Sequence, residues 1–234
     1  MTDIHQHLYW GIDDGAKTQN EMFEMLRQAH KQGIKAVVAT PHVTPGLEPL
    51  DLGLCRERHA EAQHFCDQNG LDLKIHLGAE IAWTYQTVLS LRQSRIPTLG
   101  DTDYVLLEFW RNVSWQIVED AVRQLIGAGY CPVLAHPERY RAFLLSPKRA
   151  LRFREQSGVM MQINAASLLN PASVLQRRFL RMLIEQRAVD AVASDAHGRP
   201  ARPINLLEAR KWLAANTDET YATAITNFDG IFTE

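Results

Sequence analysis

The segment Asp3-Ile4-His5-Gln6-His7, near the start of the chain, has the composition of a short buried β-strand with two histidines two positions apart. Side chains two apart on a strand point to the same side, so both imidazoles are expected to face one ion. One such pair is weak evidence by itself, because nine histidines in 234 residues sometimes fall two apart by chance. The pattern gains weight because His, Asp or Glu recurs where other predicted strands end.

Seven apolar runs along the chain predict β-strands. They are continuous instead of alternating with polar residues, which is typical of strands covered on both faces in a parallel sheet. The runs are Asp3–His7, Ala36–Thr40, Leu73–Glu80, Tyr104–Phe109, Cys131–His136, Val159–Asn164 and Val189–Ser194.

Segments with helical periodicity lie between these runs. Thr18–Gln32 has a capping box formed by Thr18 and Glu21, and Gly33 follows as a stop signal. Strands and helices alternate without a linker, which predicts an α/β fold in which residues 1–234 form one distorted, TIM-like (β/α)7 barrel domain of parallel strands. The other predicted helices are Leu54–Asn69, Thr84–Arg92, Ser114–Ala128, Pro147–Gln156, Ser173–Gln186 and Ile204–Ala215.

Composition excludes several classes of protein. A net charge of −2 and a pI near 6.5 leave no basic stripe for nucleic acid. Cys55, Cys66 and Cys131 are too few and too scattered for a disulfide framework or a thiolate zinc cluster. No apolar stretch approaches the ~20 residues that span a bilayer, and no signal segment precedes His5. We therefore expect a cytoplasmic protein without a membrane span, and the sequence leaves its oligomeric state open.

Nine nitrogen and oxygen donors form the candidate metal-ligand set. Most of them end a predicted strand, where an unpaired carboxylate is costly to desolvate unless it coordinates a cation. The absence of thiolates favours manganese, iron, zinc or magnesium. Nine donors exceed the needs of one ion, so we expect two to three divalent ions, which together can clamp a phosphoryl group. The donors are His5, His7, Asp14, His42, Glu80, Glu108, His136, Asp195 and His197.

Arginines near the same strand ends are candidates for phosphate binding, since guanidinium groups meet phosphate oxygens bidentately. Arg139 follows His136 closely, and Arg202 follows His197, with Arg199 a weaker candidate. In addition, Trp83 and Trp110 come soon after two candidate glutamates and are candidates for lining an aromatic pocket. The Pro- and Gly-containing segment Thr44–Asp51 is either a loop over the site or an ordinary surface loop.

Several motifs resemble the PHP (polymerase and histidinol phosphatase) superfamily, in order along almost the whole chain. Within it, the resemblance is to bacterial capsule and exopolysaccharide type protein-tyrosine phosphatases, and Gly11–Lys17 is its most specific element. The motifs are Asp3–His7, Gly11–Lys17, Ala39–His42, Gly78–Glu80, Leu107–Phe109, Ala135–Arg139 and Ala193–His197.

This resemblance implies a PHP-type barrel with three metal ions, often manganese. It assigns His5, His7, Glu80 and Asp195 to one ion, Glu80, Glu108 and His136 to a second, and Asp14, His42 and His197 to the third. Glu80 is then the bridging ligand. Arg139 corresponds to the family's phosphate-binding arginine, and Arg202 resembles a second one.

The leading hypothesis is a metal-dependent protein-tyrosine phosphatase in which a metal-activated hydroxide attacks phosphorus, and which controls capsule or exopolysaccharide synthesis. The resemblance suggests a capsule-assembly tyrosine kinase as the phosphorylated partner. A cysteine nucleophile is excluded, because a Cys-x5-Arg loop would need arginine at Glu61, Asp72 or Pro137. Two alternatives stay open: a small-molecule phosphatase such as a histidinol-phosphate phosphatase, and a metal-binding regulatory protein with little turnover.

Overall fold

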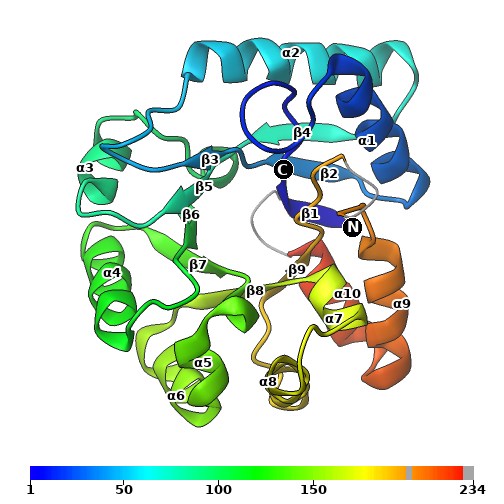
Figure 1. Cartoon of the computed structure of the whole chain (residues 1–234). Helices are drawn as coiled ribbons and strands as arrows, with labels where there is room; N and C mark the ends of the chain where they lie inside the picture. The colour runs from blue at the N-terminus through cyan, green and yellow to red at the C-terminus, as the bar shows by residue number, and fades with distance from the viewer. Residues whose placement is uncertain (199–201, 229–234) are drawn as a thin grey trace.

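The structure, a computed structural model, describes residues 1–198 and 202–228. Its parallel strands form a central ring, and its helices lie outside this ring (Figure 1). The strands are β1 (Thr2–Gln6), β2 (Ala36–Ala39), β3 (His42–Val43), β4 (Lys74–Leu77), β5 (Glu80–Ala82), β6 (Tyr104–Glu108), β7 (Cys131–Ala135), β8 (Met160–Asn164) and β9 (Ala191–Ala193).

The strands pair as two sheets that close on each other. One sheet has the order β1-β2-β4 and the other β3-β5-β6-β7-β8-β9, and all pairs are parallel. β2 runs on into β3, and β4 runs on into β5. Each of these two pairs therefore forms one bent strand of the barrel, and we call each strand position of the barrel a stave. The seam between β9 and β1 closes through Asp195 N–H to His5 O at 2.9 Å and His7 N–H to Ala196 O at 2.9 Å. In the described part of the chain this gives seven staves, which confirms the expected (β/α)7 barrel.

The chain bends in two neighbouring staves, and one of the bends divides a predicted strand. Leu73–Glu80 was expected as one strand, but it breaks after Leu77 at Gly78, where a Cβ would lie 2.7 Å from Cγ1 of Val38. In the neighbouring stave, Pro41 lies between β2 and β3, and proline has no N–H to donate to a ladder. Both bends lie at the edge of the candidate site.

The helices surround the barrel and mostly begin where expected. Thr18, Ser114 and Ser173 cap three of them, each by accepting a backbone N–H three residues on. The helices are α1 (Gln19–Lys31), α2 (Leu52–Gln68), α3 (Thr87–Arg92), α4 (Trp115–Gly127), α5 (Arg141–Leu145), α6 (Pro147–Ser157), α7 (Ala165–Leu169), α8 (Val174–Glu185), α9 (Leu206–Asn216) and α10 (Glu219–Asn227), with 3-10 turns at Leu99–Asp101 and Pro137–Arg139.

Three of these helices, α5, α7 and α10, were not predicted, and α3 begins three residues later than the predicted Thr84. The two short ones, α5 and α7, have five residues each and are too brief to leave a periodic pattern. None of the described helices is long and apolar enough to cross a membrane.

Two apolar layers fix the position of the site. The larger lies between staves and helices, and the smaller fills the barrel with alternate side chains such as Ile4, Val38, Leu106 and Val133. Phe228 at the end of α10 belongs to this interior layer. Because this layer fills the barrel, polar groups gather at the carboxyl ends of the strands, where sites of (β/α) barrels lie.

Candidate metal centre

The nine candidate ligands converge around the carboxylate of Glu80, which begins β5 and is buried. Its Oε2 lies 3.1 Å from Nε2 of His5, 3.2 Å from Nε2 of His7 and 3.1 Å from Nδ1 of His42. Its Oε1 lies 2.8 Å from Nε2 of His136. One carboxylate therefore reaches four histidines from three different staves.

His5 and His7 direct their Nε2 atoms to the same point beside Glu80. The Nδ1–H of His5 donates to Oε1 of Gln162 at 2.9 Å, and that of His7 donates to Oδ2 of Asp13 at 2.6 Å. In the neutral form of each ring, Nε2 then carries the lone pair, and the two Nε2 atoms lie 3.3 Å apart. Two facing lone pairs beside Glu80 fit a cation between them, so the donors present suit a divalent metal ion.

The regular alternation of side chains along a β-strand does not account for the positions of the His5 and His7 rings. The pairing of β1 with β2 slips between Asp3 and Gln6, and His7 lies one residue beyond β1. Irregularities of this kind re-aim side chains next to functional sites. The convergence of His5 and His7 is thus correct, but the regular strand geometry used to predict it is not.

Strand β8, the one stave whose end carries no candidate ligand, supplies supporting amides. Nε2 of Gln162 donates to Oδ1 of Asn164 at 2.9 Å, and Nδ2 of Asn164 donates to Oδ2 of Asp195 at 2.6 Å. This chain of hydrogen bonds links His5 to Asp195 and fixes both. A pattern of His, Asp and Glu does not include these amides, although both lie among the last residues of the predicted strand Val159–Asn164.

Asp13, which was not singled out from the sequence, explains the Gly11–Lys17 motif. Its Oδ2 accepts from His7 Nδ1 and also from the backbone N–H of His42 at 3.0 Å, while Oδ1 accepts from Gly15 N–H at 2.8 Å. A Cβ on Gly15 would lie 2.2 Å from the carbonyl oxygen of His7, so only glycine fits there. The loop thereby holds Asp13 against His7 and leaves the neighbouring Asp14 to face the mouth.

The buried carboxylates of the centre stabilise positive charge. Burial alone would lower the pKa of His5, but Glu80 and Asp195 outweigh it and raise that pKa above its usual value. Burial likewise opposes the charge of His7, yet its bonds to Asp13, Asp195 and Glu80 raise its pKa strongly. Burial would raise the pKa of Glu80, whereas His5 and the other histidines hold it well below the usual range. Protons and metal ions therefore compete for the same place.

A second group of donors lies toward solvent. Ring nitrogens of His7, His42 and His197 and a carboxylate oxygen of Asp14 lie within 4.8 Å of one another. Nε2 of His197 is 3.1 Å from Oδ1 of Asp14. Burial, together with His7 and Arg202, lowers the pKa of His197 to about 3, so this imidazole is neutral at physiological pH, as a ligand must be.

The remaining donors group differently from the division expected from the resemblance. His42, Glu80 and Glu108 lie within the 4.8 Å limit as one group, and His5, His136 and Asp195 as another. His136 still touches Glu80, but its Nε2 is 3.8 Å from Oε1 of Glu108. The ligand set of the second ion thus stays a prediction.

Both phosphate-binding candidates contact Asp195. The guanidinium of Arg139 lies 3.0 Å from its Oδ2, and that of Arg202 lies 2.6 Å from its Oδ1. Arg202 also donates to Nε2 of His197 at 2.5 Å, a nitrogen that must be free to bind an ion. Arg139 is therefore the better placed of the two for an anion at the mouth. Arg199 lies outside the described residues.

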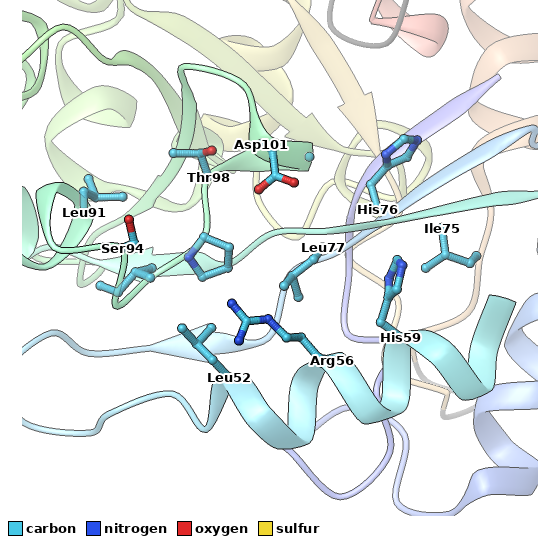
Figure 2. Close-up of a pocket in the computed structure, with 13 residues that line it drawn as sticks. Leu52, Arg56, His59, Ile75, His76, Leu77, Leu91, Ser94, Thr98 and Asp101 are labelled. Atoms are coloured by element: carbon cyan, nitrogen blue, oxygen red, sulfur yellow. The ribbon is translucent and has the colours of Figure 1, made fainter.

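Two hollows on the surface differ in their position relative to the candidate metal centre. One, of about 470 Å³, is lined by Asp14, His42 and residues 48–51, so the Thr44–Asp51 loop does lie beside the centre. Another, of about 480 Å³, is lined by Arg56 and His59 of α2, by His76 of β4 and by the segment after α3 (Figure 2). It contains none of the nine donors and is not the candidate site.

Comparisons with known proteins agree on one family. The family described as capsular polysaccharide synthesis, CpsB/CapC, matches residues 1–230. The tyrosine-protein phosphatase CpsB of Streptococcus agalactiae serotype V is 31% identical over 216 residues, which cover 90% of this chain and 88% of that protein. The tyrosine-protein phosphatase YwqE of Bacillus subtilis is 32% identical over 209 residues, 89% of this chain and 82% of that protein.

Solved structures support the same conclusion. A structure from the pair YwqE of Bacillus subtilis and CpsB of Streptococcus pneumoniae, called unique metal-dependent tyrosine phosphatases, has a TM-score of 0.87 at 29% identity and covers 100% of this chain and 97% of that one. Histidinol phosphate phosphatase of Lactococcus lactis, solved with zinc, L-histidinol and phosphate, has a TM-score of 0.58 at 16% identity over 97% of both chains, which shows a shared fold alone. This chain belongs to the CpsB/CapC capsular polysaccharide synthesis family, on a PHP-type barrel.

Proposed function

We propose that this chain is a metal-dependent phosphatase that hydrolyses phosphotyrosine in proteins, with two to three divalent ions held by its nine candidate donors. The observation that carries the proposal is the convergence of His5, His7 and Glu80, with Arg139 at the same mouth. The relatives named tyrosine-protein phosphatases support the choice of substrate.

The donor set fits manganese, iron, zinc or magnesium, and the family resemblance favours manganese. We assign His5, His7, Glu80 and Asp195 to one ion and Asp14, His42 and His197 to the third. Glu80, Glu108 and His136 would hold the second ion, so Glu80 would be the ligand shared by the first two. Ions in such sites lower the pKa of water and neutralise charge on a transferring phosphoryl group.

The residues of the chain have separate tasks in this reaction. Arg139 binds and orients phosphoryl oxygens, since a guanidinium keeps its charge and its two parallel donors at any working pH. Asp13, Gln162 and Asn164 keep the ligands in place. The tyrosine phenol has a pKa of about 10, so its departure needs less acid help than that of an alkyl alcohol.

Solvent is the nucleophile in this proposal, because the thiols are unsuitable. Cys55 and Cys66 are buried, and burial raises the pKa of Cys55 to about 12. Cys131 begins β7, so it lies at the end of the barrel away from the ligands. We further propose a cytoplasmic phosphoprotein as the partner, and a capsule-assembly tyrosine kinase is the candidate that the family suggests.

Metal removal tests the proposed function directly. Dialysis against a chelator is expected to abolish hydrolysis of a phosphotyrosine peptide, because the charge on the phosphoryl group then has only arginines to stabilise it. Addition of Mn²⁺ restores the rate, and histidinol phosphate serves as the competing substrate. Full activity in protein shown to be free of metal, or a higher kcat/KM for histidinol phosphate, contradicts the proposal.

Asp13→Asn is expected to weaken manganese binding by about tenfold to a hundredfold, because the charge that orients His7 is lost while the shape is kept. Calorimetry on metal-stripped protein measures the affinity. Asp72→Asn, an exposed carboxylate paired with Lys35 before β4, is the matched control. Equal affinities in the two variants show that Asp13 does not support the metal site.

A further inference from the structure

An apolar hollow opens directly beside the metal centre. It has a volume of about 430 Å³ and lies between the end of β6 and the turn after β7. Glu108, His136 and Arg139 form its inner edge, and these are residues of the candidate centre. Any group seated here is therefore next to a phosphoryl group held at the mouth.

The floor of the hollow is rigid. The hydroxyl of the buried Tyr140 donates to the carbonyl oxygen of Ala135 at 2.6 Å and accepts from the N–H of Phe109 at 3.2 Å. The rings of Phe109 and Tyr140 meet edge to face, with centroids 5.9 Å apart. The hydroxyl of Tyr140 is thus fully engaged, and the pair offers a fixed aromatic surface.

The outer wall is formed by an unusually exposed aromatic side chain. Trp110 is 87% exposed, which for a residue of this size leaves most of its ring in contact with water. A turn in which Val113 N–H donates to Trp110 O at 2.9 Å holds its backbone. An indole held open beside a catalytic mouth is typical of a surface that stacks on a ligand.

Arg111, the next residue, adds a charge to the rim. Its carbonyl oxygen accepts from the N–H of Arg141 at 2.8 Å, which anchors the turn to α5. Its guanidinium is exposed and makes no ion pair within residues 1–198 and 202–228.

We propose that this hollow binds the phenyl ring of the substrate phosphotyrosine against Trp110, and that Arg111 selects substrates with an acidic residue beside that tyrosine. The proposal rests on the proposed phosphatase function. An apolar cavity of about 150 Å³ can hold benzene, so the hollow has room for a phenyl ring and part of the adjoining peptide. Its contact with Glu108, His136 and Arg139 places the phosphate of such a ligand at the centre.

Equilibrium binding to the metal-loaded protein tests the ring subsite. Trp110→Ala is expected to raise the Kd of phenylphosphonate about threefold to tenfold and to leave the Kd of inorganic phosphate unchanged, because only the first ligand has a ring to stack. Steady-state rates are expected to show the same rise in KM for a phosphotyrosine peptide with kcat retained. Tyr85→Ala, which removes another highly exposed aromatic, is the matched control.

Other outcomes distinguish a wrong ring subsite from a wrong proposed function. If Trp110→Ala weakens phosphate and phenylphosphonate equally, or neither, while the wild-type protein hydrolyses phosphotyrosine, the ring subsite is wrong and the proposed function stands. If the metal-loaded wild type hydrolyses no phosphotyrosine peptide, the proposed function fails and the subsite fails with it.

Peptides of different charge test Arg111. Arg111→Glu is expected to lower kcat/KM about threefold to tenfold for a peptide with glutamate next to the phosphotyrosine, relative to the same peptide with alanine there. The wild-type preference is expected to shrink with added salt. Arg178→Glu on α8 is the control for net charge. An unchanged ratio between the two peptides overturns the role of Arg111.

Discussion

Replacing Glu80 by glutamine is expected to lower kcat on a phosphotyrosine peptide by at least about a thousandfold and to reduce the bound metal. The side chain keeps its shape but loses the charge that faces His5, His7, His42 and His136 at 2.8 to 3.2 Å. A glutamine amide cannot bridge two cations with two anionic oxygens. Metal analysis of the purified variant and single-turnover rates measure both effects.

Glu48→Gln is the matched control, since Glu48 lies on the same face of the barrel in the loop beside His42. It makes the same chemical change outside the cluster and is expected to leave metal content and rate within about twofold, as surface substitutions usually do. A Glu80→Gln protein that keeps its full metal complement and a rate close to that of wild type would falsify the assignment of Glu80 as the bridge.

The ring of ligands was predictable because a residue at the carboxyl end of any strand of a parallel barrel lies at the same mouth in space. His42, Glu80, Glu108, His136 and Asp195 come from distant parts of the sequence, yet each follows or ends a buried run. Once those runs are parallel staves, their carboxyl ends must meet at one mouth.

The supporting residues were harder to predict for a physical reason. Gln162 and Asn164 are neutral amides at the end of β8, and nothing in their residue type indicates that they orient His5 and Asp195. Asp13 was overlooked because two adjacent aspartates in a loop give no sign of which one turns inward. That choice depends on Gly15, which lets the loop approach the backbone of His7.

Backbone conformation sets a further limit on prediction. His136 and Asp195 both have positive φ, 36° and 53°, a region that non-glycine residues seldom occupy. Conformations of this kind cost on the order of 1–3 kcal/mol and persist where the surroundings hold them, often at functional sites. Here the closing bond from Asp195 N–H to His5 O and the amide chain from β8 hold Asp195 in place. No sequence pattern reveals such compensation.

Arg139→Ala is expected to lower kcat/KM for a phosphotyrosine peptide by about a hundredfold to a thousandfold, with metal content unchanged. Its guanidinium is 3.0 Å from Asp195 and borders the hollow beside the centre, so it can reach a phosphoryl oxygen without being a ligand. Arg139→Lys is expected to recover part of the rate, because an ammonium keeps the charge but not the two parallel donors.

Arg141→Ala, two residues further along on α5, removes an exposed arginine from the same region and is the matched control. A loss in Arg139→Ala no greater than that in Arg141→Ala would show that Arg139 does not act on the phosphoryl group.

Arg202 is tested by the same kind of substitution, since its bond to His197 Nε2 competes with a ligand role for that nitrogen. If Arg202→Ala tightens metal binding while Arg139→Ala leaves it unchanged, then Arg139 alone carries anion recognition and Arg202 acts through the ligands.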